Sequence, residues 1–188
     1  MKKIIFFLSC LPLMAVAQQK DKINYYASYQ FGMTVGKAYT TINAQMIQGI
    51  RYKNYQAGVG VALDPYGFRT IPVFGHVAYM LHPQKSSPYV YADAGVSIPW
   101  NSGVITEKNP ATKQEWHKLY SGLYAEAGIG YSIAINKRHA VTFSGGYSYK
   151  KFRYTENVQT WDGNVIIQQK DWYIFNYRRL AFRIGFSF

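Results

Sequence analysis

The last nine residues of the chain read Leu180-Ala181-Phe182-Arg183-Ile184-Gly185-Phe186-Ser187-Phe188. Large apolar residues alternate with small or polar ones, and this period of two is typical of a β-strand with one apolar and one polar face. The strand runs to the final residue, although the termini of water-soluble domains usually fray. A transmembrane barrel needs such a strand, because its last strand closes the ring against the first. The tail therefore favours a membrane barrel.

The same alternation recurs upstream of the tail. Seven earlier segments show it, and the tail belongs to an eighth: about 25–35, 41–52, 55–63, 69–81, 89–98, 119–135, 140–150 and 173–188. Long connections, about 99–118 and 151–172, follow the fifth and seventh segments, whereas short polar ones follow the second, fourth and sixth. Short turns at one end and longer loops at the other are typical of outer-membrane barrels. The sequence predicts one all-β domain, an eight-stranded antiparallel up-and-down transmembrane β-barrel.

The beginning of the chain predicts export. Two lysines, an apolar stretch at 4–16 and a small-residue site ending at Ala17 have the order of a secretory signal peptide. We expect residues 1–17 to be cleaved, which leaves 18–188 as the barrel domain. Cys10 raises a lipoprotein alternative, but it comes too early in the apolar stretch. It is the only cysteine in the sequence, so the mature chain would have no disulfide and no thiol chemistry.

The net charge of the precursor is +12. In a cytosolic protein this excess of basic residues would suggest nucleic acid as a partner. An exported chain does not meet nucleic acid in normal function, so none is expected here. Outer-membrane lipid and the phosphates of lipopolysaccharide are the expected anionic partners.

Charged residues lie near the middle of several polar strand faces. In a narrow barrel these faces point into a packed lumen, where charged groups must be paired. We therefore expect an internal salt-bridge plug, with Arg183 as the partner of Glu126. The predicted lumen network consists of Arg51, His76, Asp93, Glu126 and Arg183.

The sequence shows no constellation of catalytic residues. A hydrolase on such a barrel would need a nucleophile, a histidine and an acid clustered at the outer rim. His117 lies near Glu115, but only Ser121 is at hand as a nucleophile. Four scattered histidines and no mature cysteine predict no metal site, and the strand glycines precede no helix that could bind phosphate. We expect no enzymatic activity, no catalytic residue and no cofactor.

A basic group flanks the connection predicted at about 151–172. A hairpin would bring its two halves together at the outer end of the barrel, where like charges repel one another unless an anion offsets them. This predicts either a solvated rim or a site for lipopolysaccharide phosphates, with Trp161, Trp172 and Tyr173 beside it. The predicted basic outer rim consists of Lys150, Lys151, Arg153, Lys170, Arg178 and Arg179.

By its terminal Phe, its eight alternating strands and its signal peptide, the chain resembles small outer-membrane barrels of the OmpA/OmpX-like superfamily. Residues 55–64, 71–74 and 87–95 are similar to a Bacteroidetes-type family of such barrels. The resemblance implies a place in the outer membrane of a Gram-negative bacterium and a structural or surface-interaction role. It also implies periplasmic chaperones and the barrel-assembly machinery as partners during biogenesis. The assembly signal would consist of Phe182, Ile184, Phe186 and Phe188.

Two alternatives stay open at this point. A soluble lipocalin-like barrel that binds an apolar ligand would place the large residues inside and the small and charged ones outside. A lipid A-modifying barrel would share the membrane fold but would need a catalytic cluster at its rim.

Overall fold

The computed structural model describes residues 23–188 except 38, 83–85, 101–116, 137–138 and 162–165, and for 117–118 and 156–171 it describes the backbone alone. The predicted signal peptide lies outside these residues. The strands are β1 (Asn24–Gly36), β2 (Thr40–Tyr52), β3 (Tyr55–Leu63), β4 (Thr70–Met80), β5 (Ser86–Pro99), β6 (His117–Tyr120), β7 (Gly122–Ala134), β8 (Ala140–Trp161) and β9 (Ile166–Ser187). No helix in this part of the chain is long and apolar enough to cross a membrane.

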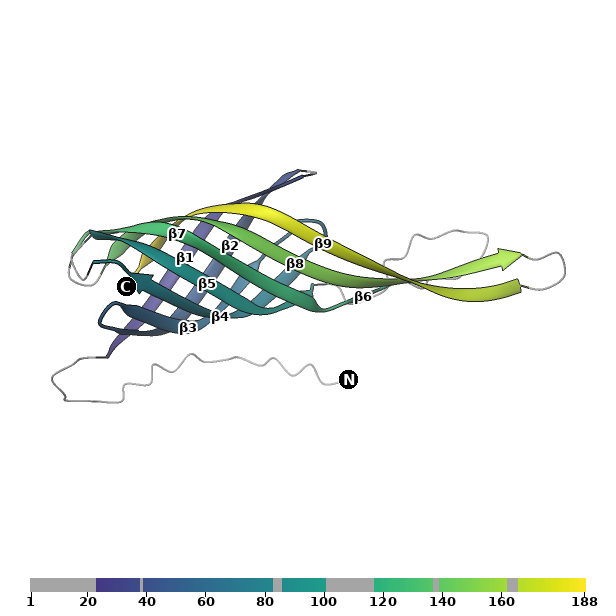
Figure 1. Cartoon of the computed structure of the whole chain (residues 1–188), viewed down its shortest axis with the longest axis horizontal. Helices are drawn as coiled ribbons and strands as arrows, with labels where there is room; N and C mark the ends of the chain where they lie inside the picture. Colours follow the sequence, from purple (N-terminus) through teal and green to yellow (C-terminus); the bar gives the residue numbers. More distant parts are fainter. Residues whose placement is uncertain (1–22, 38, 83–85, 101–116, 137–138, 162–165) are drawn as a thin grey trace, which may run out of the picture.

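The strands form a closed antiparallel barrel (Figure 1). Its eight members follow the order β8-β7-β5-β4-β3-β2-β1-β9, and β9 pairs with both β1 and β8 to complete the ring. The last residue takes part in the closure, because Phe188 and Ala27 exchange two backbone hydrogen bonds of 2.8 and 2.9 Å. The fold class predicted from the terminal alternation is confirmed.

Strand β6 is a continuation of β7 across a bulge. Tyr124 lies opposite Lys150 on β8, whereas Tyr120 lies opposite Arg153, so four residues on one strand span three on the other. The extra residue falls at Ser121, between the two strands, and such a bulge bends a strand and increases its twist. The sixth segment predicted at about 119–135 is thus one strand with a bend near the outer end of the barrel.

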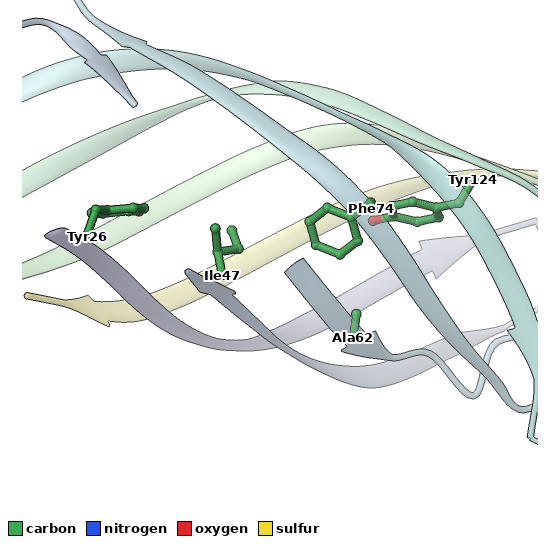
Figure 2. Packing of buried hydrophobic residues seen from close by; sticks show 5 residues of the cluster. All are labelled: Tyr26, Ile47, Ala62, Phe74 and Tyr124. Carbon is green, nitrogen blue, oxygen red and sulfur yellow. The ribbon is translucent and has the colours of Figure 1, made fainter. Parts of the chain in front are cut away.

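Large apolar side chains face outward around the barrel. Ile42, Phe31 and Ile129 are 80%, 66% and 69% exposed, and β4 alternates between buried and exposed residues along most of its length. Inside, one row of buried apolar side chains follows the barrel axis (Figure 2), made of Tyr26, Ile47, Ala62, Phe74 and Tyr124. The lipocalin-like alternative required the opposite orientation and is wrong.

Glycines make room for the aromatic side chains of the lumen. A Cβ built on Gly60 would lie 2.5 Å from the ring of Phe74, and one built on Gly130 would lie 2.3 Å from the ring of Tyr89. Contacts this short do not occur between real atoms, so larger residues would displace these rings. The lumen is therefore filled by side chains packed over glycine backbone, as expected for eight strands.

The last two strands extend beyond the barrel as a long hairpin. β8 and β9 pair with each other from Ala140↔Ser187 to Trp161↔Ile166, but β1 pairs with β9 only as far as Arg179. Residues 166–178 therefore project past the closed wall (Figure 1) by roughly 40 Å at the usual rise of a strand. The loop predicted at about 151–172 was wrong, because most of it is paired strand. The apolar–polar alternation weakens in this region, where the hairpin no longer forms part of the closed wall.

Candidate functional site

The centre of the lumen holds a carboxylate clamped by an arginine. Glu126 on β7 is 3% exposed, and its two oxygens face the guanidinium of Arg183 on β9, with one Nη2–Oε2 distance of 2.8 Å. The hydroxyls of Tyr91 and Tyr124 donate to the same carboxylate at 2.9 and 3.0 Å. The structure brings together the pair expected from the sequence. Two planar charge-assisted bonds are the strongest arrangement for such a buried pair.

The arginine also connects this pair to polar side chains on β1 and β2. The Nε of Arg183 donates to Oδ1 of Asn43 at 3.2 Å, and Nδ2 of Asn43 donates to the hydroxyl of Thr34. One layer further along the axis, Gln45 donates to Gln30 at 2.9 Å. Polar side chains thus bridge β1, β2, β7 and β9 across the interior.

The other predicted lumen residues lie in two separate places. His76 and Asp93 are buried and form one pair, with 2.6 Å between Nδ1 and Oδ1. Arg51 lies near the end of the barrel where β1 begins and β9 ends, over the ring of Tyr26, whose centroid is 5.3 Å from its Cζ. The predicted network is therefore one buried ion pair, one buried His–Asp hydrogen bond and one arginine stacked on an aromatic ring.

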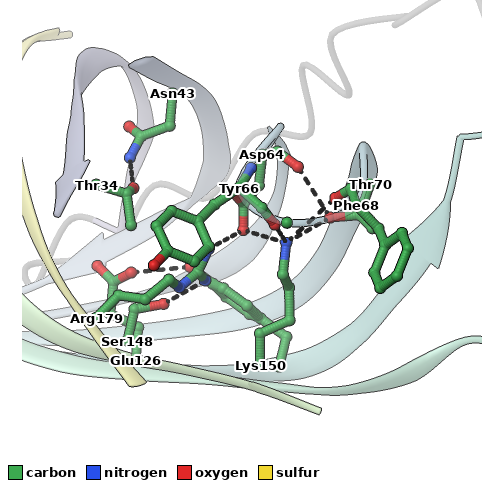
Figure 3. Close-up of polar contacts among 12 residues, drawn as sticks. Thr34, Asn43, Asp64, Tyr66, Phe68, Thr70, Glu126, Ser148, Lys150 and Arg179 are labelled. Carbon is green, nitrogen blue, oxygen red and sulfur yellow. Dashed lines mark hydrogen bonds and ion pairs between the residues drawn. The ribbon is translucent and has the colours of Figure 1, made fainter. Parts of the chain in front are cut away.

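A second buried cluster closes the opposite end, called here the outer mouth (Figure 3). Asp64, just after β3, accepts from Lys150 of β8 at 3.0 Å and from Arg179 of β9 at 2.5 Å. Lys150 is 0% and Arg179 is 3% exposed. Their placement on a solvated basic rim was therefore wrong: both cations point inward, because Asp64 and nearby carbonyl groups offset their charge.

The cations fasten residues 64–70, named here the mouth cap, across the opening. Nζ of Lys150 donates to the carbonyl of Tyr66 at 2.8 Å and to the hydroxyl of Thr70 at 3.2 Å. Arg179 donates to Ser148 at 2.9 Å and lies over the ring of Tyr66. Burial alone would raise the pKa of Asp64, but the charges of Arg179 and Lys150 outweigh it and hold that pKa below its usual value. Asp64 stays ionised and links the cap to two strands.

Aromatic rings extend this fastening to the base of the long hairpin. Tyr66 stacks on Tyr39 with 4.5 Å between ring centroids and meets Tyr177 edge-on at 5.6 Å. Phe68 meets the rings of Phe152 and Phe175 edge-on. The turn between Tyr66 and Phe68 depends on Gly67, whose φ of +71° suits glycine. Two rings of the mouth cap, those of Tyr66 and Phe68, therefore pack against the base of the hairpin.

Sequence reasoning missed Asp64, although strand parity contained the signal. The inward face of β3 reads Gln56, Gly58, Gly60 and Ala62, and the next residue on that face is Asp64. The same count along β8 runs from Ser148 to Lys150. The prediction ended the inward face of β8 at Ser148 and assigned Lys150 to an exposed rim, whereas Lys150 is the next residue on that inward face.

The remaining residues of the predicted rim lie on the hairpin. Arg153 and Arg178 are exposed and Lys151 is half-buried, while the side chain of Lys170 lies outside the described part. By register and parity, these three cations share the outward face of the hairpin, with Lys151 opposite Asn176 and Arg153 opposite Ile174. The residues of the predicted assembly signal all project from the outer wall: Phe182, Ile184, Phe186 and Phe188.

Within the described residues, no three His, Cys, Asp or Glu side chains gather in a way that could hold a metal ion. The side chain of His117, which the sequence places near Glu115, lies outside the described part, and Glu115 lies outside it altogether.

Comparison with known proteins identifies the fold. No family model matches the chain, and no curated protein matches its sequence. The solved structures that are similar to this chain include two small outer-membrane proteins. OprG from Pseudomonas aeruginosa has a TM-score of 0.54 at 8% identity, over 87% of this chain and 95% of that one. AlkL, solved in lipid bilayers, has a TM-score of 0.50 at 11% identity, over 93% of this chain and 94% of that one. The chain shares its fold with small barrels of the outer membrane.

Proposed function

We propose that the protein is a non-enzymatic barrel of the outer membrane of a Gram-negative bacterium and a relative of the OmpA/OmpX-like superfamily. In this proposal the β8–β9 hairpin is an interaction arm at the cell surface, and its basic face contacts lipopolysaccharide. The observation that carries the proposal is the hairpin itself, which continues beyond a closed and internally packed barrel.

The outer surface of the barrel supports a membrane location. Its exposed side chains are apolar on every strand of the ring, among them Phe31, Val59, Val77, Leu123 and Ile184. A closed barrel satisfies its backbone groups internally, which is the condition for β-structure in a lipid bilayer. In water, so much exposed apolar surface would cause aggregation.

The lumen supports a structural rather than a transporting role. The Glu126–Arg183 pair and the ring of Tyr124 lie across its middle, and the mouth cap lies across its outer end. A solute would have to break a buried ion pair to pass, which costs several kcal/mol. The hairpin is therefore the part of the molecule that is best placed to meet a partner.

The outward face of the hairpin suits an anionic surface. Arg153, Lys151 and Arg178 follow one another along it on neighbouring strands, and Trp172 lies on the same face and is 57% exposed. Cations at an anionic membrane surface contribute about 1 kcal/mol each. Tryptophan is favoured where lipid meets water. Together these groups match the phosphates and the sugar–lipid boundary of lipopolysaccharide.

The test is co-purification of lipopolysaccharide with folded protein. An Arg153→Gln/Arg178→Gln variant removes two exposed cations from the hairpin and should bind lipopolysaccharide about thirty-fold more weakly, the effect of about 2 kcal/mol. A Lys37→Gln/Lys53→Gln variant removes the same charge elsewhere and should retain the wild-type amount. Equal retention by both variants would refute lipopolysaccharide contact through the hairpin.

A further inference from the structure

The barrel wall has a gap where β2 loses its partner. β2 pairs with β3 from Tyr52↔Tyr55 only to Ala44↔Leu63. Beyond that point, residues 40–43 of β2 pair only with β1 among the described strands, and the tip of the β1–β2 hairpin stands away from the wall (Figure 1). The chain turns inward at Asp64 to form the mouth cap instead of continuing β3. The wall is thus open beside β2 at its outer end.

A cavity of about 430 Å³ occupies this gap. Its wall includes the outward-facing side chains of Phe31, Ile42 and Leu63, and Trp100 lies at its edge. Asn43 and Asp64, which face the lumen, form part of its inner side. The volume lies within the range of cavities that bind small ligands. We call this cavity the wall slot.

The surroundings of the slot define what can fill it. Phe31, Ile42 and Leu63 belong to the apolar outer surface of the barrel, so the slot opens toward the hydrocarbon of the bilayer. Peptides and sugars would leave their polar groups unsatisfied there. An acyl chain can pack against the apolar wall without leaving any polar group unsatisfied. A volume of this size suits a single chain better than a whole multi-chain lipid.

One cation marks the polar end of the slot. Arg69 lines the cavity, is exposed, and forms no ion pair with any described carboxylate. Its carbonyl accepts from the backbone N–H of Trp100 at 2.9 Å, which holds the two residues together at the slot edge. Asp64, the nearest acid of the lining, is already held by Lys150 and Arg179. The Arg69 guanidinium is therefore available to an anionic group at the membrane surface.

We propose that the wall slot binds one acyl chain of an anionic amphiphile, with its carboxylate or phosphate on Arg69. The proposal rests on the membrane location proposed above. The chain lies along Phe31, Ile42 and Leu63, and Trp100 packs against its upper part.

The fluorescence of Trp100 can report occupancy. A Trp116→Phe/Trp161→Phe/Trp172→Phe background leaves it as the sole tryptophan. The folded protein, in micelles of a neutral maltoside detergent, is titrated with dibromostearate, whose bromines quench nearby tryptophan. The methyl ester of the same acid tests the need for charge. A phosphatidylglycerol with one dibromo chain compares phosphate with carboxylate.

The expected result is saturable quenching by the acid or the phosphatidylglycerol and weaker binding of the ester. Arg69→Gln should raise the half-saturation concentration of the anionic probe about two- to fivefold, the range of an exposed ion pair. Ala44→Phe fills the slot and should abolish saturation. Two control variants make the same kinds of change outside the slot lining: Lys37→Gln removes a charge from the outer loop, and Ala94→Phe adds a ring to the exposed wall. Both should leave the quenching curve of the anionic probe unchanged.

Two results would overturn the proposal. Quenching that rises without saturation, equally in all variants, would reflect partition into the micelle alone. Saturation that survives Ala44→Phe, or equal binding of acid and ester, would refute the slot or the role of Arg69. If the protein folds in membranes but gives either of these results, the acyl-chain site is refuted and the proposed function stands. If the protein does not insert into membranes, the proposed function is refuted.

Discussion

Replacing Glu126 by leucine should destabilise the barrel strongly. The carboxylate accepts two bonds from Arg183 and one each from Tyr91 and Tyr124, and it is almost fully buried. Its loss leaves the guanidinium in the lumen with Asn43, at 3.2 Å, as its one remaining hydrogen-bond partner among the described side chains. Breaking a buried ion pair from one side costs about 3–5 kcal/mol. We expect Glu126→Leu to lower the free energy of unfolding by that amount.

The double variant separates the charge effect from packing. Glu126→Leu/Arg183→Met replaces both partners by apolar side chains, which is often neutral or stabilising. We therefore expect it to recover most of the loss, with a coupling energy of at least about 2 kcal/mol between the two sites. Urea unfolding of the protein in lipid vesicles, followed by tryptophan fluorescence, measures all four free energies. A cost below about 1 kcal/mol for Glu126→Leu, or additive single effects, would refute the clamp.

Three further outcomes follow from the mouth cap, the tail and the lumen. Because the folded pKa of Asp64 is lowered, its contribution to stability is complete above the unfolded value of 3.8 and is lost as the pH falls through the folded value. The stability difference between wild type and Asp64→Asn should therefore shrink below about pH 4 in acid titrations of unfolding, and a difference independent of pH would contradict the ion pairs. Deleting Phe188 removes its paired bonds with Ala27 and should reduce membrane insertion in cells, whereas normal insertion would contradict its role as an assembly signal. In planar bilayers the packed lumen should give no stable large conductance, and a steady open pore would contradict the plug.

Strand parity predicted much of the structure. Alternation of apolar and polar residues placed Phe182, Ile184 and Phe186 outside and Arg183 inside, because the side chains of a strand alternate strictly between its faces. The same rule, with the need to pair buried charges, predicted Glu126 against Arg183. These inferences succeed because a membrane outside and a packed lumen inside impose opposite demands on neighbouring residues.

The parts that could not be predicted lie where a strand no longer has both an apolar outer face and a packed lumen to constrain its residues. Past Lys150 the hairpin leaves the closed wall, so a packed lumen no longer requires its inner face to be small or polar, and its sequence resembles a loop. The mouth cap depends on contacts between Asp64 and residues more than eighty positions away, which no local pattern encodes. The wall slot arises from the inward turn of the chain after Leu63, and only the register of β2 with β3 reveals it.

Cysteine labelling in intact cells tests the central claim, a barrel that spans the outer membrane and projects its hairpin outward. Cys10 is the only cysteine and lies in the expected signal peptide, so single variants can be labelled without background. Arg178→Cys, on the hairpin, should react with a membrane-impermeant maleimide in intact cells. His82→Cys, in the β4–β5 turn at the opposite end, should react only after the outer membrane is permeabilised. Equal labelling of both sites in intact cells, or protection of the hairpin site, would contradict this account.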